Sequence, residues 1–315
     1  MPAGGSRSRS TGLKGRDLVA ITDFSRGEIE RVFQVADGMK RFTKTGTDLL
    51  KRRVICTMFF EPSTRTRLSF ETAMIRLGGS AVGFADPSSA RVVTGESLAD
   101  TIRMGSSYSN VIVLRHKIEG AAKLAAEVSD VPVLNGGDGS HHHPTQTLTD
   151  LYTISREVGG VDGVKMALLG DLRQTRSAMS LAIALTMFKN VELFLVSPPA
   201  LRMRKEVLDQ LDGARVKYTQ LERVDDVLGE LDVLYVNRLQ KERFADPAEY
   251  ERLKGSYFIT RKMLEGARGK MIVMHHLPRI DDIPLDIDST RHARYFQQAA
   301  NGLPVRMALL SEVVE

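Results

Sequence analysis

Short apolar runs alternate with amphipathic stretches along most of this sequence, and that alternation limits the possible folds more than any single residue does. The first run, residues 54–60, shows no polar alternation; it is long enough for a buried strand and too short for a helix. Strands that alternate with helices are typical of parallel sheets with helices on both faces. The candidate strands are residues 54–60, 81–84, 111–114, 131–134, 166–169, 191–196, 216–218, 233–236 and 271–274. The candidate helices include residues 28–42, 120–128, 146–156, 177–188, 201–211 and 300–314.

The best linker signal is the Gly-Gly-Val-Asp-Gly run at residues 159–163, which follows one helical stretch and precedes a new strand. A chain of 315 residues is long enough for two ordinary domains. We therefore expect an α/β protein with two doubly wound parallel-sheet domains, at residues 1–150 and 151–299.

The composition is that of an ordinary globular protein, with 42% hydrophobic and 26% charged residues. No apolar run approaches the roughly 18 residues of a membrane span. Residues 1–12 lack the apolar stretch of a secretory signal, and a transit peptide is a less favoured alternative because this tail is so short. The formal net charge is +5, and positions 1–16 hold four basic residues and no acid. We therefore expect no membrane partner and no nucleic-acid partner.

Cys56 is the only cysteine and lies inside the first candidate strand. A single cysteine cannot form an intrachain disulfide, which fits a reducing cytoplasm. Its position predicts a small buried hydrophobic residue rather than a reactive thiol.

Polar residues gather directly after six of the candidate strands. Because ligands of open parallel sheets bind at the carboxyl ends of the strands, these residues predict an active site in the cleft between the two domains. The six groups are Glu61 to Arg65, Arg115-His116, residues 135–143, Gly170-Asp171, Asn237-Arg238 and His275-His276.

The segment FEPSTRTRLSFE at residues 60–71 joins the first strand to a helix, since apolar residues at Phe70, Met74 and Leu77 follow at helical spacing. At such a junction the first backbone N–H groups are unpaired and the helix dipole is positive. The hydroxyls and the guanidinium of residues 63–66 complete a site suited to a doubly charged phosphate. The simpler alternative is a Ser/Thr N-cap with solvated arginines.

Arginines are numerous at the predicted edge, and acids, mainly Glu61 and Asp171, are few. Arginine pairs bidentately with phosphate and carboxylate, so the edge suits substrates with several negative charges. The alternative for each arginine is a surface charge or a pair with an acid. The six arginines are Arg65, Arg67, Arg115, Arg176, Arg238 and Arg279.

The segment at residues 60–71 closely resembles the carbamoyl-phosphate loop of the aspartate/ornithine carbamoyltransferase family. The resemblance extends from about residue 13 to about residue 310. The sequence HPTQ at residues 143–146 resembles a family loop, and HHLPR at residues 275–279 resembles the family's HPLPR. The sequence NRLQKER at residues 237–243 resembles the aspartate-binding loop, whereas ornithine enzymes carry Ser-Met-Gly there.

The resemblance assigns roles residue by residue. Arg65, Thr66, Arg115 and His143 are the implied catalytic groups, because donors aimed at a developing oxyanion lower the barrier. Backbone carbonyls of Leu277 and Pro278 are implied to contact the substrates. The implied carbamoyl-phosphate site is Ser63, Thr64, Arg65, Thr66, Arg115, His143, Gln146, Leu277 and Pro278, and the implied aspartate site is Arg176, Arg238 and Gln240.

The resemblance further implies that the carbamoyl group moves from carbamoyl phosphate to the amine of L-aspartate, an early step of pyrimidine (UMP) biosynthesis in the cytoplasm. It implies a homotrimer with sites at subunit boundaries, sometimes joined by a separate regulatory chain. It also implies that the last helix, about residues 300–315, packs back on the first domain.

No cofactor is expected. The segment at residues 170–176 lacks the Gly-x-Gly-x-x-Gly dinucleotide fingerprint. The three consecutive histidines, residues 141–143, invite a metal interpretation, but adjacent histidines make poor common ligands. We expect His141 and His142 to face solvent.

The sequence departs from the family pattern at several positions. The loop that reaches the neighbouring subunit's site in the family has Thr94 at its catalytic lysine position and Arg91 at its serine position. His276 replaces a proline, residues 173–174 replace Lys-Tyr, and Met179 replaces a histidine. Three interpretations follow: an aspartate carbamoyltransferase, a carbamoyltransferase with another amino-acid acceptor, and a non-catalytic homologue that acts as an assembly partner.

Overall fold

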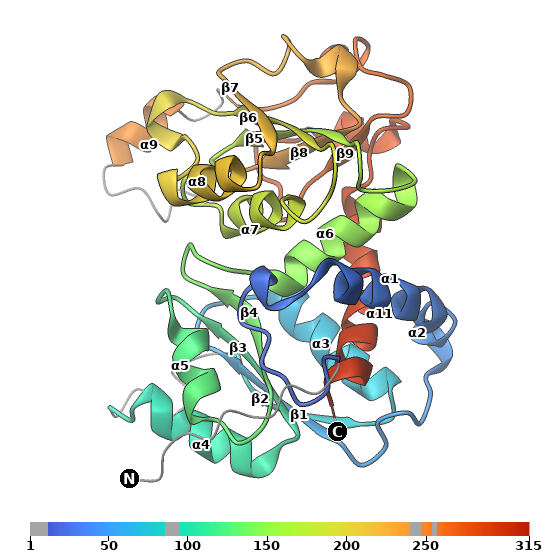
Figure 1. Ribbon diagram of the computed structural model, residues 1–315, viewed down its shortest axis with the longest axis vertical. Helices are drawn as coiled ribbons and strands as arrows, with labels where there is room; N and C mark the ends of the chain where they lie inside the picture. Colours follow the sequence, from blue (N-terminus) through green and yellow to red (C-terminus); the bar gives the residue numbers. More distant parts are fainter. Residues whose placement is uncertain (1–11, 86–94, 240–246, 254–256, 315) are drawn as a thin grey trace. The chain divides into compact units, whose positions relative to one another are not determined.

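The computed structural model describes residues 12–85, 95–239, 247–253 and 257–314 (Figure 1). The chain forms two compact units. Unit 1 is Met1–Leu148 with Gly302–Glu315, and unit 2 is Thr149–Asn301. The boundaries therefore fall inside two helices, α6 (Pro144–Glu157) and α11 (Tyr295–Val313). The Gly-rich run at residues 159–163 lies in unit 2, between α6 and β5.

Unit 1 holds a four-stranded parallel sheet in the order β2-β1-β3-β4. Side chains of β1 and β3 alternate between its two faces, so that Cys56, Met58, Ile112 and Leu114 join one core cluster. The same cluster takes Ile102 from α4 and alanines from α5. The strands are β1 (Val54–Phe59), β2 (Ser80–Phe84), β3 (Val111–His116) and β4 (Val133–Asp138).

Helices cover both faces of the unit 1 sheet: α4 and α5 pack on one face and α3 on the other (Figure 1). The helix α1 begins with a capping box, in which Ser25 and Glu28 satisfy each other's backbone N–H groups. The helices are α1 (Arg26–Met39), α2 (Phe42–Thr45), α3 (Thr64–Arg76), α4 (Leu98–Tyr108) and α5 (Ala121–Val128), with η1 at Ile21–Asp23.

Unit 2 holds a five-stranded parallel sheet in the order β7-β6-β5-β8-β9. The chain starts at the central strand β5 and winds outward in both directions, which is the doubly wound arrangement. The strands are β5 (Lys165–Gly170), β6 (Glu192–Val196), β7 (Lys217–Leu221), β8 (Val233–Asn237) and β9 (Ile272–Met274).

One face of the unit 2 sheet carries a core cluster in which Leu169, Val196, Val236 and Val273 meet Tyr295 of α11. The helices α7 and α8 lie together on the opposite face (Figure 1). The remaining elements are α7 (Arg176–Leu185), α8 (Lys205–Gly213), α9 (Pro247–Leu253), α10 (Arg261–Leu264), η4 (Pro199–Leu201), η5 (Leu228–Glu230) and η7 (Leu285–Ser289).

The expected fold class is confirmed, because both sheets are parallel and every candidate strand is present. The structure differs at the helices: the stretch at residues 28–42 is two helices, and α4 had no counterpart among the expected ones. Cys56 is buried as expected, and burial raises the pKa of its thiol to about 11. Within the described residues no helix is long and apolar enough to cross a membrane.

Candidate active site

The junction of β1 and α3 has the features of an anion site. Ser63 is the N-cap of α3 in an extended conformation, and its side chain makes no capping hydrogen bond. Its hydroxyl is therefore not committed to the helix, which argues against the simple N-cap interpretation. Thr64 and Arg65 are exposed on the first turn, Thr66 is buried, and this turn contains no acid. The unpaired N–H groups and the helix dipole favour a bound anion here.

Arg115 lies at the carboxyl end of β3 and is oriented by two neighbours. Its Nε donates to Glu61 Oε2 at 3.1 Å, and its Nη1 donates to the Gly136 carbonyl at 3.3 Å. A Cβ atom at Gly136 would lie 3.5 Å from the Thr66 methyl group. The structure therefore brings Thr66 and Arg115 together beside β4.

His143 precedes the first residue of α6 and is buried. Its Nδ1 lies 3.4 Å from the Thr145 hydroxyl, and its carbonyl accepts a hydrogen bond from the Gln146 N–H at 3.0 Å. The contact with Thr145 positions the His143 ring, which lies beyond the carboxyl end of β4 in unit 1. Gln146 is half-buried one turn further along α6.

The neighbouring histidines differ from the expectation that both face solvent. His141 is exposed, but the Nδ1 atom of His142 is buried. The two rings are 3.7 Å apart. Burial, and then the positive charge of His141, lower the pKa of His142 to about 4. Among the described residues no three His, Cys, Asp or Glu side chains are placed to hold a metal ion.

In unit 2, the loop after β5 leads into the helix that carries Arg176. The carboxylate of Asp171 is fully buried, and its Oδ1 accepts hydrogen bonds from the N–H groups of Arg173 at 3.0 Å and Gln174 at 2.8 Å. This turn places Arg176 at the first position of α7, largely buried at a second positive helix end. Gly170 allows the loop to form, because a Cβ there would lie 1.9 Å from the Asn237 carbonyl.

Arg238 follows β8 and lines a small pocket. The other described lining residues are Leu239, Tyr250, Tyr257, Phe258, Ile280, Asp281 and Asp282. The guanidinium of Arg238 is suited to pair with a carboxylate, whereas Asp281 and Asp282 add negative charge to the lining. The remaining predicted residues Gln240, Arg91 and Thr94 lie outside the described residues.

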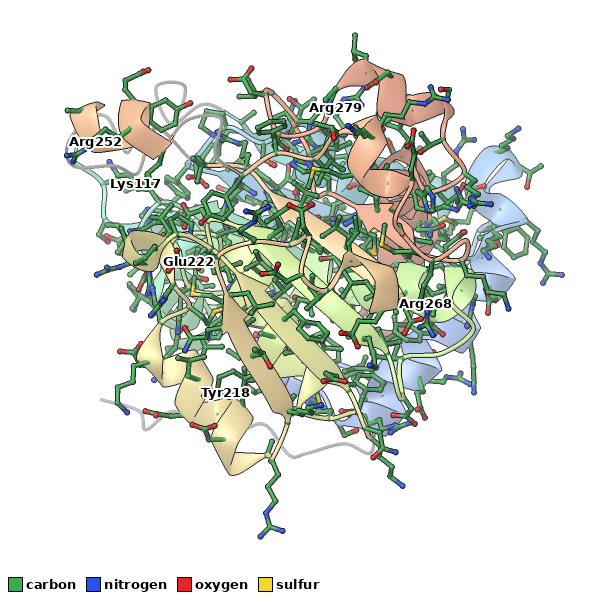
Figure 2. All side chains as sticks on the ribbon, turned by 90° about the horizontal axis from the view of Figure 1, so that it is seen from above. Lys117, Tyr218, Glu222, Arg252, Arg268 and Arg279 are labelled. Carbon is green, nitrogen blue, oxygen red and sulfur yellow. The ribbon has the colours of Figure 1, made fainter. Side chains whose placement is uncertain are left out.

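The loop after β9 contains the predicted contacts Leu277 and Pro278. Leu277 is half-buried with a φ of +58°, and Pro278 is exposed. Arg279, labelled in Figure 2, pairs with Asp288 and donates to the Tyr295 hydroxyl at 3.1 Å. Its side chain is therefore directed within unit 2.

Ion pairs to a named acid are seen for three of the six arginines expected at the edges. Arg67, Arg115 and Arg279 pair with Glu71, Glu61 and Asp288 respectively, as the alternative interpretation anticipated. Arg65, Arg115, Arg176 and Arg238 lie at or after the carboxyl ends of β1, β3, β5 and β8, as expected.

Sequence reasoning missed two side chains that hold the β9 loop, Asp282 and Gln298. Asp282 contacts His275 Nε2, and Gln298 accepts from the His275 N–H at 2.8 Å. Neither lies in a motif or directly after a strand, so no local signal identified them. His276 adds a further link, because its Nδ1 lies 3.3 Å from the Ser177 hydroxyl of α7.

Comparison with known proteins agrees with this geometry. Residues 16–156 match the family model "Aspartate/ornithine carbamoyltransferase, carbamoyl-P binding domain", and residues 162–313 match "Aspartate/ornithine carbamoyltransferase, Asp/Orn binding domain". The chain is 53% identical over 297 residues to the aspartate carbamoyltransferase catalytic subunit of Pyrobaculum arsenaticum, covering 94% of this chain and 97% of the relative.

Solved structures give the same result. The catalytic subunit of M. jannaschii aspartate transcarbamoylase is similar with a TM-score of 0.87 at 50% identity, covering 94% of this chain and 97% of that one. The Trypanosoma cruzi aspartate transcarbamoylase in complex with N-(phosphonacetyl)-L-aspartic acid is similar with a TM-score of 0.91 at 40% identity, covering 96% and 97%. The resemblance found in the sequence is thereby confirmed, and the chain belongs to the aspartate/ornithine carbamoyltransferase family.

Proposed function

We propose that this protein transfers the carbamoyl group of carbamoyl phosphate to the amine of L-aspartate, giving N-carbamoyl-L-aspartate and phosphate in pyrimidine biosynthesis. The observation that carries this function is the start of α3, where Ser63 makes no side-chain capping bond and Arg65 lies on the first turn, at the positive end of the helix. A similar T. cruzi structure, 38% identical with a TM-score of 0.90, is a complex with carbamoyl phosphate and aspartate.

In this proposal the unit 1 edge holds the donor. Ser63, Thr64 and Arg65 bind the phosphate, while Thr66, Arg115 and His143 donate to the carbonyl oxygen as it gains charge in the tetrahedral transition state. The contact of Arg115 with the Gly136 carbonyl supports this role, because it keeps the guanidinium beside Thr66. Gln146 then binds the carbamoyl amide.

The unit 2 edge binds the acceptor in the same proposal. Arg176 and Arg238 pair with the two carboxylates of aspartate, Gln240 adds a polar contact, and the carbonyls of Leu277 and Pro278 accept from the substrates. The aspartate amine attacks the carbamoyl carbon, the C–O bond to phosphate breaks, and the departing phosphate takes the amine proton. Alignment of the two bound anions lowers the barrier, by about 7–11 kcal/mol in favourable cases.

One experiment separates this function from the two other interpretations. Product formation is measured from labelled carbamoyl phosphate with aspartate, with other amino acids, and with no acceptor. Labelled N-carbamoyl-L-aspartate supports the proposal, and a different labelled product reveals another acceptor. Absence of turnover with purified protein supports the non-catalytic homologue, which Thr94 at the usual lysine position favours.

We also propose a homotrimer in which residues 91–94 reach the site of a neighbouring subunit. Exposed apolar side chains in unit 1 support a subunit contact: Leu68 and Ile75 share one face of α3, and Val82 lies on the edge strand β2. Dilution to monomers should then abolish activity, as followed in size-exclusion fractions. An active monomer contradicts the proposal.

Two further features of the assembly are proposals. The relatives are named catalytic subunits, which supports an assembly with a separate regulatory chain. Copurification of a second kind of polypeptide with the tagged chain from its own cells tests this. The single cysteine supports a reducing compartment, the cytoplasm, which fractionation tests.

A further inference from the structure

The loop after β9 depends on a backbone conformation that needs support. Leu277 adopts a φ of +58°, a left-handed conformation that crowds the Cβ of a leucine and is rare for such residues. Its N–H donates a hydrogen bond of 2.8 Å to Nδ1 of His275, two residues earlier. His275 directly follows β9 and is completely buried. The imidazole therefore holds the Leu277 peptide in place from inside unit 2.

This bond determines where the proton of His275 lies. A ring nitrogen that accepts a hydrogen bond carries no proton, so neutral His275 is protonated at Nε2. The Nε2 atom lies 2.5 Å from Oδ2 of Asp282, an ion-pair distance, and both atoms are buried with no hydrogen-bond partner in the described part of the chain. Asp282 thus selects the tautomer that Leu277 requires.

Asp282 is itself fixed by the loop that it supports. Its Oδ1 accepts from the Ile280 N–H at 3.0 Å, and its carbonyl accepts from the Ile259 N–H at 3.1 Å. Burial alone would raise the pKa of Asp282, but the close contact with His275 and the hydrogen bond from the Ile280 N–H together lower it. The group that faces His275 is accordingly a carboxylate, an acceptor for the Nε2 proton.

The backbone of His275 is anchored by a second set of buried contacts. Its N–H donates to Gln298 Oε1 at 2.8 Å, and Gln298 Nε2 donates to Asp150 Oδ1 at 2.7 Å. The Tyr235 hydroxyl donates to the other oxygen of Asp150 at 3.0 Å. Gln298 of α11 therefore holds the backbone of His275, and Asp282 contacts its ring. Together these contacts leave the ring one orientation.

We propose that His275 is a positioning residue, whose Asp282-selected tautomer holds the Leu277 amide and thereby aims the Leu277 carbonyl at the substrate. The inference rests on the proposed function, in which that carbonyl accepts from the substrates. His275 does not touch the reacting atoms; it acts through the peptide between residues 276 and 277.

The test uses two carboxamides that each replace one ring nitrogen. The oxygen of His275→Asn takes about the place of Nδ1 and still accepts from Leu277, whereas the amide of His275→Gln reaches the place of Nε2 and leaves Leu277 without an acceptor. We expect kcat to fall about 100-fold in His275→Gln, a typical effect of misplacement by about 1 Å, and to be largely preserved in His275→Asn. Equal kcat values in the two variants would overturn the proposal.

A third variant changes the tautomer and leaves the ring in place. In Asp282→Asn, Oδ1 continues to accept from Ile280, so the new NH₂ group faces Nε2 and the His275 proton moves to Nδ1. Two donors, Nδ1–H and the Leu277 N–H, then face each other. We expect a loss of kcat similar to that of His275→Gln, with a ¹⁵N spectrum of labelled histidine in which one signal changes from Nε2-protonated to Nδ1-protonated.

The ¹⁵N spectrum also separates this inference from the proposed function. The His275 signal is assigned as the one that is missing from the spectrum of His275→Asn. A wild-type protein without carbamoyl transfer refutes the function whatever the tautomer. An active wild-type protein with Nδ1-protonated His275, or an Asp282→Asn variant with unchanged tautomer and full kcat, refutes the positioning role alone. If the His275 variants do not fold, the wild-type and Asp282→Asn spectra decide.

Discussion

The carboxyl edges of the two sheets are built in different ways. In unit 1, the features of an anion site come from one contiguous stretch, Ser63 to Thr66, at the start of α3. In unit 2, the loop after β9 is held by residues distant in sequence, because Gln298 lies 23 residues beyond His275. A helix end binds an anion through its own N–H groups, whereas a carbonyl in a left-handed loop must be supported from behind. We expect this difference to divide the two substrates as well.

The largest expected effect is at the contiguous site. Arg65→Ala removes a charge-assisted bidentate pair with phosphate, which typically costs about 2–5 kcal/mol of binding free energy. Carbamoyl-phosphate affinity measured by calorimetry should therefore be nearly lost. The matched control is Arg67→Ala, two residues along the same helix, because Arg67 pairs with Glu71 at 3.6 Å. If Arg65→Ala binds carbamoyl phosphate normally, α3 is not the phosphate site.

A gain of activity is expected at Thr94. Thr94→Lys places an ammonium group at the family's lysine position, and one such group in a shielded site contributes about 2.7–4 kcal/mol to transition-state stabilisation. Turnover should then rise about 100- to 1,000-fold in steady-state assays. Such a gain would show that residues 63–66 of unit 1 are not sufficient for turnover. The unit 1 edge would then also need a group from another part of the chain, as the unit 2 edge does.

Arg91 provides the paired measurement. If Arg91 already supplies the positive charge, Thr94→Lys should give little gain and Arg91→Ala should abolish most turnover. If neither substitution changes the rate, the loop has no catalytic role. If no variant turns over, including the double Arg91→Ser/Thr94→Lys, the non-catalytic interpretation replaces the proposed function.

The unit 2 edge should respond through the acceptor alone. Arg238→Ala removes a hydrogen bond to a charged carboxylate, worth about 1.5–3 kcal/mol. The apparent affinity for aspartate should fall about 10- to 150-fold, while carbamoyl-phosphate affinity stays unchanged. Arg252→Ala, in α9, is the control for loss of a cation in unit 2 (Figure 2). A mutant that loses only carbamoyl-phosphate affinity reverses the assignment of the two edges.

The contiguous features of the protein could be predicted from the sequence because their signals are local. Apolar runs such as residues 54–60 identify buried strands, and polar residues at their ends identify the edge to which Arg115 and His143 belong. The helix α4 was not anticipated, although Ser97 caps it by accepting from the Asp100 N–H.

The dispersed features could not be predicted because they depend on tertiary contacts. Nothing in the spacing of Asp150, Tyr235 and Gln298 indicates that they form one buried network. The pairing of His275 with Asp282 depends on the path of an irregular loop, which no periodicity describes. The same holds for Arg279, whose place in a family motif predicted an edge position but not its ion pair with Asp288.

The smallest expected effect concerns pH and is confined to unit 1. Burial holds the pKa of His142 at about 4 in the folded protein, below the ordinary value of 6.5, so the unfolded chain binds the proton more tightly. His142 therefore contributes stability that is complete above pH 6.5 and is lost as the pH falls toward 4. Between pH 7 and pH 5.5 the loss is about 1 kcal/mol.

His142→Phe keeps a ring against His141 but cannot titrate, so its unfolding free energy, measured by urea denaturation, should lose this dependence on pH. Three acids, Asp138, Asp23 and Glu119, oppose the shift, and the variant retains them. His141→Phe is the matched control: it removes the smaller, electrostatic cause and should keep most of the slope, because burial is the larger cause. Hydrogen exchange should place the pH-dependent loss in unit 1. Burial also lowers the pKa of His116, which adds a smaller slope of the same sign in unit 1. A slope as steep in His142→Phe as in the wild type would show that the His142 ring is not the source.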